Sequence, residues 1–307
     1  MISRGVVALV LGGATVLPSV ASAVGKDPLR AAEEGTAYRF DWPVGKIGTM
    51  TYTHTKPIGG EMQTISVRYD VNVERDGSGK TTVSFLKPKL VNGPPGSRGV
   101  EGLMAQIQPP ITVDSDGRFV ATPPGSGEAV LKSMTELAGK DVIPPEARAG
   151  LMSMLDTRTR NFWNMLVGAF IGKKVAPDST NPIRAKHTVM PGMPAVEVTG
   201  TGKTSKLRPC EQGSKAQCVE YTEASTISAS DMEKIMQSMG AKLGVDVAAI
   251  AKGISMESVT QRTFVVTEPA RLLPRILRTE RLSVVKLEGK SQKIADVEQW
   301  EFSYASR

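Results

Sequence analysis

The sequence predicts an α+β fold in which a curved antiparallel sheet, a half-barrel, has about three helices covering one face. Residues 64–73 alternate strictly between apolar and polar side chains, which is typical of an antiparallel strand with one face in the core and the other in water. Helical periodicity is confined to 127–139, 146–170 and 230–243. The elements run as strands, helices, strands, helix, strands, and this order argues against a regular βαβ fold.

The N-terminal strands are expected to form a meander. Alternation in 64–73 places one apolar set on the core side of the strand: Ile65, Val67, Tyr69, Val71 and Val73. The sequence Asp76-Gly77-Ser78-Gly79 predicts a hairpin into a strand at 81–86, because glycine supplies the positive φ that such turns need. Residues 47–55 show the same alternation and predict a strand that precedes these two.

Similar patterns place the later elements. Pro144-Pro145 opens the longest helix, at 146–170, in which Arg158 and Arg160 stand between apolar turns. Ser230 and Glu233 form a capping box that begins the helix near residue 230. Further strands are predicted at 111–113, 119–121, 186–190, 195–201, 203–207, 217–223, 256–267, 275–287 and 290–304.

The first 23 residues predict a cleaved signal peptide. Arg4 supplies a positive start, Gly5 to Leu17 is uncharged and largely apolar, and Ala21-Ser22-Ala23 is a small-x-small cleavage signal. The apolar run is shorter than the roughly 20 residues that a membrane-spanning helix needs. No cysteine stands beside the cut, so no lipid attachment is expected there. We therefore expect a single exported α+β domain at 24–307, periplasmic or secreted, without a transmembrane helix.

Cysteine content and charge narrow the function further. Cys210 and Cys218 are the two cysteines of the chain, and in an oxidising compartment we expect them to form a disulfide that staples a short loop. Cleavage removes Arg4 and no acidic residue, so the net charge falls from +7 to +6. The basic residues are spread along the chain, which argues against nucleic acid as a partner. An anionic membrane surface fits this charge, and so does plain solubility.

The chain contains partial matches to known catalytic and binding motifs, but none of them is complete. Gly200 to Thr204 ends like a phosphate-binding loop but lacks the first glycine and a following helix. Ser283 and Lys286 have the S-x-x-K spacing, but on a strand they point to opposite faces. His54 and His187 have no partners at metal-ligand or catalytic spacing. We expect no catalytic residue, metal or cofactor, while a pair of distant carboxylates stays open as a hydrolase alternative.

The predicted helices are rich in methionine, whose flexible thioether adapts to irregular apolar partners. These side chains, together with inward sheet residues, are candidates for lining a lipid cavity. Ordinary packing of helices on the sheet explains the same residues equally simply. The candidate lining residues are Val67, Tyr69, Val71, Leu155, Phe162, Met165, Leu166, Met232, Met236 and Met239.

The nine residues from Thr267 to Arg275, Thr-Glu-Pro-Ala-Arg-Leu-Leu-Pro-Arg, resemble the turn that feeds a strand in periplasmic lipoprotein carriers, the LolA and LppX-like half-barrels. The order of elements is also similar to that of these proteins and of uncharacterised exported bacterial proteins. The resemblance implies that acyl chains are held between a concave sheet and a helical lid.

Two functions follow as expectations. The first is a non-enzymatic exported protein that binds a lipid or another hydrophobic ligand between a curved sheet and its helices, with burial of apolar surface as the driving force. The second is an envelope structural or interaction protein with a filled core and no ligand cavity. Its contacts would come from the Pro- and Gly-rich segment at 92–126.

Overall fold

The computed structural model describes residues 37–58, 61–94, 108–129, 131–132, 145–173, 177–188, 195–212, 214–243, 254–287 and 290–304. The predicted signal peptide at 1–23 lies outside these residues. The extent of the exported domain, 24–307, therefore remains a prediction.

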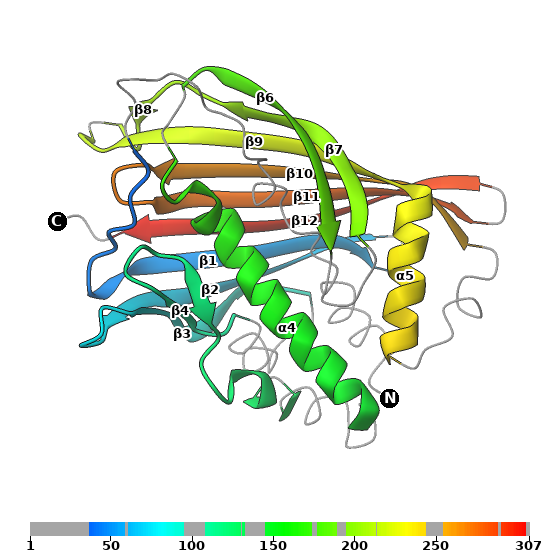
Figure 1. Ribbon diagram of the computed structural model, residues 1–307, viewed down its shortest axis with the longest axis horizontal. Coiled ribbons are helices and arrows are strands. Elements are labelled where there is room, and N and C mark those ends of the chain that lie inside the picture. Colours follow the sequence, from blue (N-terminus) through cyan, green and yellow to red (C-terminus); the bar gives the residue numbers. More distant parts are fainter. Residues whose placement is uncertain are drawn as a thin grey trace.

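The molecule is built on one large antiparallel sheet (Figure 1). The strand order is β5-β4-β3-β2-β1-β12-β11-β10-β9-β7-β6, with β8 paired to β9 outside this path. The strands are β1 (Gly45–Ile58), β2 (Glu61–Arg75), β3 (Thr81–Asn92), β4 (Ile111–Val113), β5 (Phe119–Ala121), β6 (Ser179–Thr188), β7 (Ala195–Thr204), β8 (Arg208–Pro209), β9 (Gln217–Ser228), β10 (Ile254–Glu268), β11 (Leu273–Leu287) and β12 (Lys290–Tyr304). The first strand pairs with the last, so β1 and β12 lie side by side in the middle of the sheet.

Most strands lie where the alternation predicts them. The predicted hairpin between β2 and β3 is present: the Asp76 carboxylate accepts from the Ser78 and Lys80 amides, and Gly79 has φ +83°. The strands predicted at 111–113, 119–121 and 290–304 have the predicted bounds, and β10 and β11 extend the predicted strands at 256–267 and 275–287 by one or two residues at an end. A period-two pattern is a local signal, and the sheet then lengthens each strand by pairing.

Two strand predictions are wrong in their bounds. The strands expected at 195–201 and 203–207 are a single strand, β7, because Gly202 continues the ladder instead of turning. A Cβ atom at Gly202 would lie 2.8 Å from the Tyr221 hydroxyl, so glycine is required here by a close neighbour. β6 begins at Ser179, before the predicted residue 186, and includes Pro182, which an edge strand tolerates.

The helical segments are also close to their predicted places. α4 (Pro145–Leu166) is followed by a single 3-10 turn, η2 (Gly168–Phe170), and residues 126–129 and 131–132 are helical as well. α5 (Ala229–Leu243) starts directly after β9. The predicted cap at Ser230 is wrong, because Ser228 Oγ accepts from the Asp231 amide at 3.2 Å and is the N-cap.

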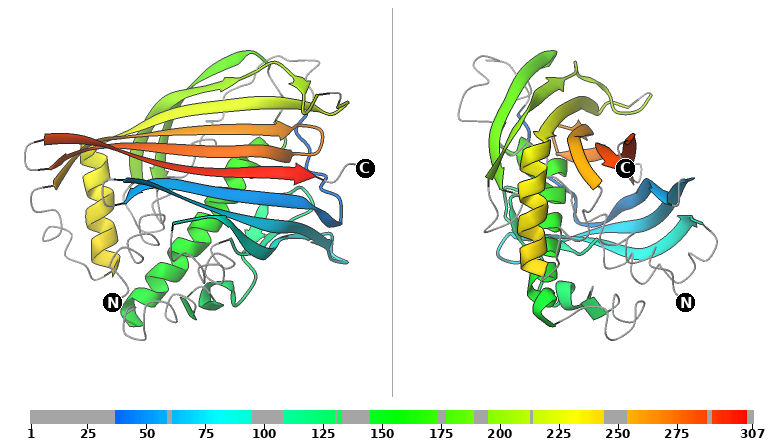
Figure 2. Two further views of the ribbon diagram at one scale, coloured as in Figure 1. Left: turned by 180° about the vertical axis from the view of Figure 1, so that it is seen from behind. Right: turned by 90° about the vertical axis from the view of Figure 1, so that its right-hand side faces the viewer.

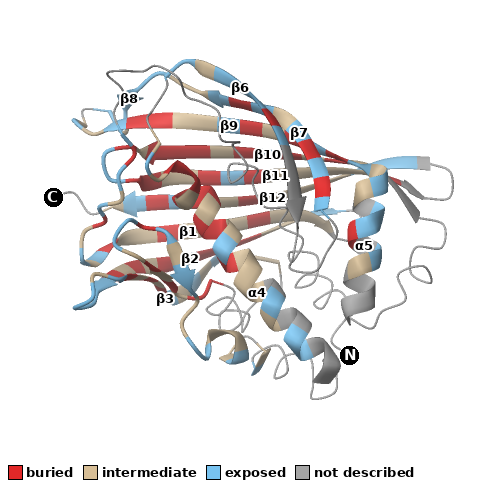
Figure 3. Ribbon diagram, in the orientation of Figure 1, coloured by how far each residue is buried: buried red, intermediate tan, exposed pale blue. Residues whose placement is uncertain are grey.

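Both long helices lie against the same face of the sheet, which we call the inner face (Figure 2). α5 lies over β9 and β10, α4 crosses towards β11, and the two helices contact each other. Side chains beneath α4 and η2 form an apolar core with many aromatic rings (Figure 3). Trp42 and Trp163 lie 5.5 Å apart in it, and their indole N–H groups donate to the backbone carbonyls of Leu272 and Gly117. The structure thus confirms a large antiparallel sheet with helices on one side.

Candidate functional site

The inner face divides into an apolar part and a polar part. One row of paired residues runs across five neighbouring strands and is apolar or aromatic. Its members are Val67, Tyr52, Trp300, Leu277 and Val265. The adjacent row on the same face crosses β1, β12, β11, β10 and β9, and on each of these strands it lies two residues away from the apolar row. It is polar, and all of its members are buried. They are His54, Glu298, Thr279, Thr263 and Glu223.

Polarity continues into the row after that. Asp296 pairs with Arg281, Arg281 with Gln261, and Gln261 with Ser225. Gln261 and Ser225 are buried, and Asp296 and Arg281 are half-buried. We call these two rows together the polar belt. A buried belt of this kind is unusual, because buried polar groups destabilise a fold unless they are paired.

α4 reaches both parts of the inner face with one side of the helix. The Phe162 ring lies 5.3 Å from the Trp300 ring, over the apolar row. One helical turn earlier, Arg158 donates to Glu298 Oε1 at 3.4 Å, over the polar belt. One turn of helix advances about 5.4 Å, and two residues of strand advance about 6.6 Å. Residues one turn apart on this side of α4 therefore lie over residues two apart on β12.

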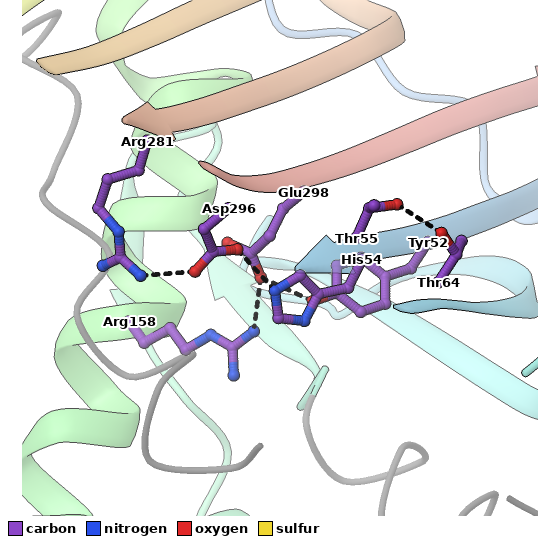
Figure 4. A network of polar contacts seen from close by, with 8 residues as sticks. All are labelled: Tyr52, His54, Thr55, Thr64, Arg158, Arg281, Asp296 and Glu298. Atoms are coloured by element: carbon purple, nitrogen blue, oxygen red, sulfur yellow. Dashed lines mark hydrogen bonds and ion pairs between the residues drawn. The ribbon is translucent and has the colours of Figure 1, made fainter. Parts of the chain in front are cut away.

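Hydrogen bonds and ion pairs join the polar groups at the centre of the belt (Figure 4). The Tyr52 hydroxyl donates to Glu298 Oε1 at 2.6 Å. His54 Nε2 lies 2.7 Å from Asp296 Oδ1, and Arg281 donates to Asp296 Oδ2 at 2.5 Å. Each carboxylate is therefore held by one group from β1 and by one arginine, from α4 for Glu298 and from β11 for Asp296. Such pairing is what allows carboxylates to stay charged under a protein layer.

The pKa values report the same surroundings. Burial alone would raise the pKa of Asp296, but its hydrogen bond to His54 and the charge of Arg281 bring the pKa below its usual value. Burial, together with the neighbouring Glu298 carboxylate, raises the pKa of Tyr52 well above its usual value. Burial also lowers the pKa of Lys56, which lies within electrostatic reach of Asp296 and Glu298.

A third carboxylate lies deeper in the belt. Glu223 is 1% exposed and accepts a 3.1 Å hydrogen bond from the Tyr221 hydroxyl. Burial and the Glu223 charge both raise the pKa of Tyr221. Burial lowers the pKa of Lys173, and the charge of Glu223 acts in the opposite direction and raises it. Lys173 and Glu223 therefore interact electrostatically. The belt thus carries charged groups from β1 to β9.

Two buried donors beside this network are left without a partner in the part of the chain that the structure describes. They are the Thr263 hydroxyl, in the middle of the polar row, and the Trp300 indole N–H, next to Glu298 on β12. These residues are 1% and 2% exposed. A buried donor without an acceptor costs about 1–3 kcal/mol, so both positions are places where a further acceptor would be stabilising.

The residues predicted to line a cavity have different surroundings. Val67, Tyr69 and Leu166 are 1% exposed or less, so they touch no space that a water molecule can enter. Val71, Phe162 and Met165 belong to the same core, and Leu155 is half-buried. Met232, Met236 and Met239 lie on α5, and their side chains lie outside the described part. A ligand could reach the core residues only if α4 moved away from the sheet.

The sequence analysis missed the polar belt, although two local signals point to it. Asp296 and Glu298 stand at inward positions of a strand that otherwise places Ile294, Trp300 and Phe302 on that side. Arg158 stands one turn before Phe162 on the covered side of a helix. A charge at an apolar position of a periodic pattern is the sign that could have found each of them.

Three other expectations concern the chain as a whole. Cys210 and Cys218 form the predicted disulfide. None of the described helices has the length and apolar character needed to cross a membrane. Within the described residues, no three side chains of His, Cys, Asp or Glu gather as metal ligands would. The side chain of His187 lies outside the described part, whereas His54 belongs to the belt.

Comparison with known proteins does not assign the chain to a family. No family model and no curated protein matches it. Among solved structures it is similar to lipovitellin, in a structure described as "Lipid-protein interactions in lipovitellin", with a TM-score of 0.40 and 12% identity. The similarity covers 87% of this chain and 26% of the lipovitellin chain, so this chain spans about a quarter of that protein. At this level the similarity carries no conclusion about function.

Proposed function

We propose that this protein is an exported, non-enzymatic binding protein for a lipid or another hydrophobic molecule that has a polar end. The ligand lies between the sheet, which acts as a half-barrel, and the helices on its inner face. The periplasm or the extracellular space is the proposed location, in keeping with the Cys210–Cys218 disulfide. An anionic membrane surface is the proposed source of the ligand.

The observation that carries this proposal is the contact between the apolar row and the polar belt on one covered face. Trp300 and Glu298 are neighbours on the same side of β12, and α4 covers both with Phe162 and Arg158. An amphipathic molecule has the same division along its length. Its hydrocarbon part would gain about 25 cal/mol per Å² of apolar surface buried, and its polar end would find fixed hydrogen-bonding groups.

In this proposal α4 acts as the cover that opens for the ligand. Its C-terminal half is held down by Phe162, Trp163 and Leu166, which are buried. Its N-terminal half includes the exposed residues Arg148 and Ser153. Arg158 stands between the two halves, and its 3.4 Å contact with Glu298 is longer than a strong charge-assisted hydrogen bond.

The test is to purify the chain from 24 to 307 and examine it by native mass spectrometry and by lipid extraction. We expect a co-purified lipid, or saturable binding of a fluorescent fatty acid. Phe162→Leu should speed exchange of the bound probe several-fold, because it loosens the contact between α4 and β12. Phe264→Leu is the matched control and should leave exchange unchanged, because Phe264 alternates with the inward residues Thr263 and Val265 on β10 and therefore points to the opposite face of the sheet. A purified chain that carries no lipid and takes up no probe would reject the proposal.

The second candidate function is that of an envelope structural or interaction protein without a ligand cavity, and the close packing of α4 on the sheet favours it. If the inner face stays closed, contacts must come from elsewhere, and the segment at 92–126 is the place to look. Cross-linking in intact cells separates the two functions: a reproducible protein partner, together with no lipid binding, supports this one. An enzyme is the remaining alternative, for which a hydrolase screen with His54→Ala and His187→Ala is the direct test.

A further inference from the structure

We propose that Arg158 and the unpartnered donors beside Glu298 form a binding site for an anionic group, a carboxylate or a phosphate, at the polar end of the ligand. This inference rests on the proposed binding function and adds the chemical class of the head group.

Arg158 is positioned for such a role and is only partly used. Its side chain is 17% exposed and lies on the covered side of α4. The guanidinium carries five N–H donors, and its described hydrogen bond goes to Glu298 Oε1 at 3.4 Å. That oxygen already accepts from Tyr52 at 2.6 Å. An oxyanion could therefore replace Glu298 as the acceptor and take two donors of Arg158 in the bidentate geometry that arginine favours.

Trp300 decides the sign of the ligand group. The indole N–H is a donor only, so a ligand group that satisfies it must be an acceptor. Trp300 lies two residues after Glu298 on the same side of β12, and its ring contacts Phe162, one turn after Arg158. The Thr263 hydroxyl belongs to the same row as Glu298, two strands away, and can donate to the same kind of group. An oxygen-rich group would satisfy the indole N–H, whereas a cation would not.

The charges around the site favour an anion as well. Arg158, Arg281 and Lys56 are three cationic side chains around two carboxylates, Asp296 and Glu298. Deeper in the belt, Lys173 and Glu223 form an oppositely charged pair. At these partly buried positions, the arrangement attracts one additional negative charge more strongly than it would in bulk water.

Occupying the site requires a small movement of α4. The Trp300 N–H and the Thr263 hydroxyl are inaccessible when Arg158 contacts Glu298. Lifting α4 from β12 separates Arg158 from Glu298, and Glu298 keeps its hydrogen bond to Tyr52, which belongs to the sheet. A ligand oxyanion can then lie between Arg158 and the Trp300 indole. The head group thus replaces a protein carboxylate as the partner of Arg158.

The experiment compares three probes with the same eighteen-carbon chain: oleate, oleoyl lysophosphatidate and neutral oleyl alcohol. Binding to the chain from 24 to 307 is measured by tryptophan fluorescence and calorimetry, below the concentration at which each probe forms micelles. We expect at least one anionic probe to bind about tenfold more tightly than the alcohol, and the preferred probe tells carboxylate from phosphate. Arg158→Gln should abolish this preference, so that the anionic probes bind no more tightly than the alcohol binds to the same variant.

Matched variants keep the outcome interpretable. Arg160→Gln, on the same helix with a more exposed side chain, should bind like the wild-type chain. Arg158→Lys should restore part of the preference because it keeps the charge. Trp300→Phe keeps an aromatic ring without the N–H, and it should reduce the preference for the anionic probe over the alcohol about threefold; it carries the test if Arg158→Gln does not fold.

Two results overturn the inference in different ways. Equal affinity for all three probes, or an anion preference that survives both Arg158→Gln and Trp300→Phe, removes the head-group site and leaves the proposed function standing. No binding of any probe rejects the proposed function, and the head-group site with it.

Discussion

The Tyr52 hydroxyl donates a 2.6 Å hydrogen bond to Glu298 Oε1, so a buried carboxylate joins the first strand of the sheet to the last. Tyr52 and Glu298 are separated by 246 positions in the chain. The same oxygen accepts from Arg158 on α4, so this one carboxylate connects two neighbouring strands in the middle of the sheet, β1 and β12, to the helix above them. Its position explains why a charged residue is retained on a covered face.

Tyr52→Phe should therefore be costly. The variant leaves Glu298 with a weaker set of donors, and a hydrogen bond to a charged group is worth about 2 kcal/mol, so the free energy of unfolding should fall by about that amount. Tyr304→Phe is the matched control: it removes a 2.7 Å hydrogen bond to the neutral carbonyl of Pro274 and should cost about 1 kcal/mol. Urea denaturation measures both. Equal costs for the two variants would contradict the role given to Glu298.

All five tyrosines should resist ionisation until the chain unfolds. Burial is the main cause that raises the pKa of each one: Tyr38, Tyr52, Tyr69, Tyr221 and Tyr304. An acid whose pKa is raised by folding contributes stability that is complete below its unfolded value, here 10.0, and is lost as the pH rises towards the folded value. Tyrosinate absorbance should thus appear together with the loss of β-sheet circular dichroism. Gradual ionisation centred on pH 10.0 in a folded chain would refute this.

Thr263→Val should make the protein more stable. The hydroxyl is buried and has no partner in the described part of the chain, so replacing it with a methyl group of similar size removes a desolvation cost of about 1 kcal/mol. Thr159→Val is the control, because the Thr159 hydroxyl donates to the Leu155 carbonyl at 2.9 Å and its loss should not stabilise. Thermal unfolding compares the two. A lower stability for Thr263→Val would mean that an acceptor satisfies this hydroxyl in solution.

Removing the disulfide should destabilise the chain without changing the fold. The bond closes a loop with a sequence separation of 8 residues, and chain entropy gives such a ring about 2.5 kcal/mol of stabilisation. The double substitution Cys210→Ser and Cys218→Ser should lower the free energy of unfolding by about that amount and leave the circular dichroism spectrum unchanged. Comparison with the reduced wild-type chain separates the loss of the bond from the effect of the serines. An unchanged free energy of unfolding would show that the disulfide constrains the unfolded chain very little.

The sequence by itself determined the elements of this protein. Alternation predicted the strands, the residues from Asp76 to Gly79 predicted the turn, and helical periodicity predicted α4 and α5. These signals are local, because side-chain direction repeats within a few residues. Local signals also failed where a neighbour decided: Gly202 continues a strand because Tyr221 lies beside it, and Ser228 caps α5 because β9 runs directly into the helix.

Only the tertiary structure decided what the inner face contains. His54, Glu298 and Thr263 form one row because the register of β1, β12, β11 and β10 aligns them, and no single strand carries that information. Arg158 meets Glu298 because the advance of a helix and that of a strand agree over one turn. Strand register and helix docking depend on contacts between distant parts of the chain, so a large antiparallel sheet with helices could be predicted from the sequence and the polar belt could not.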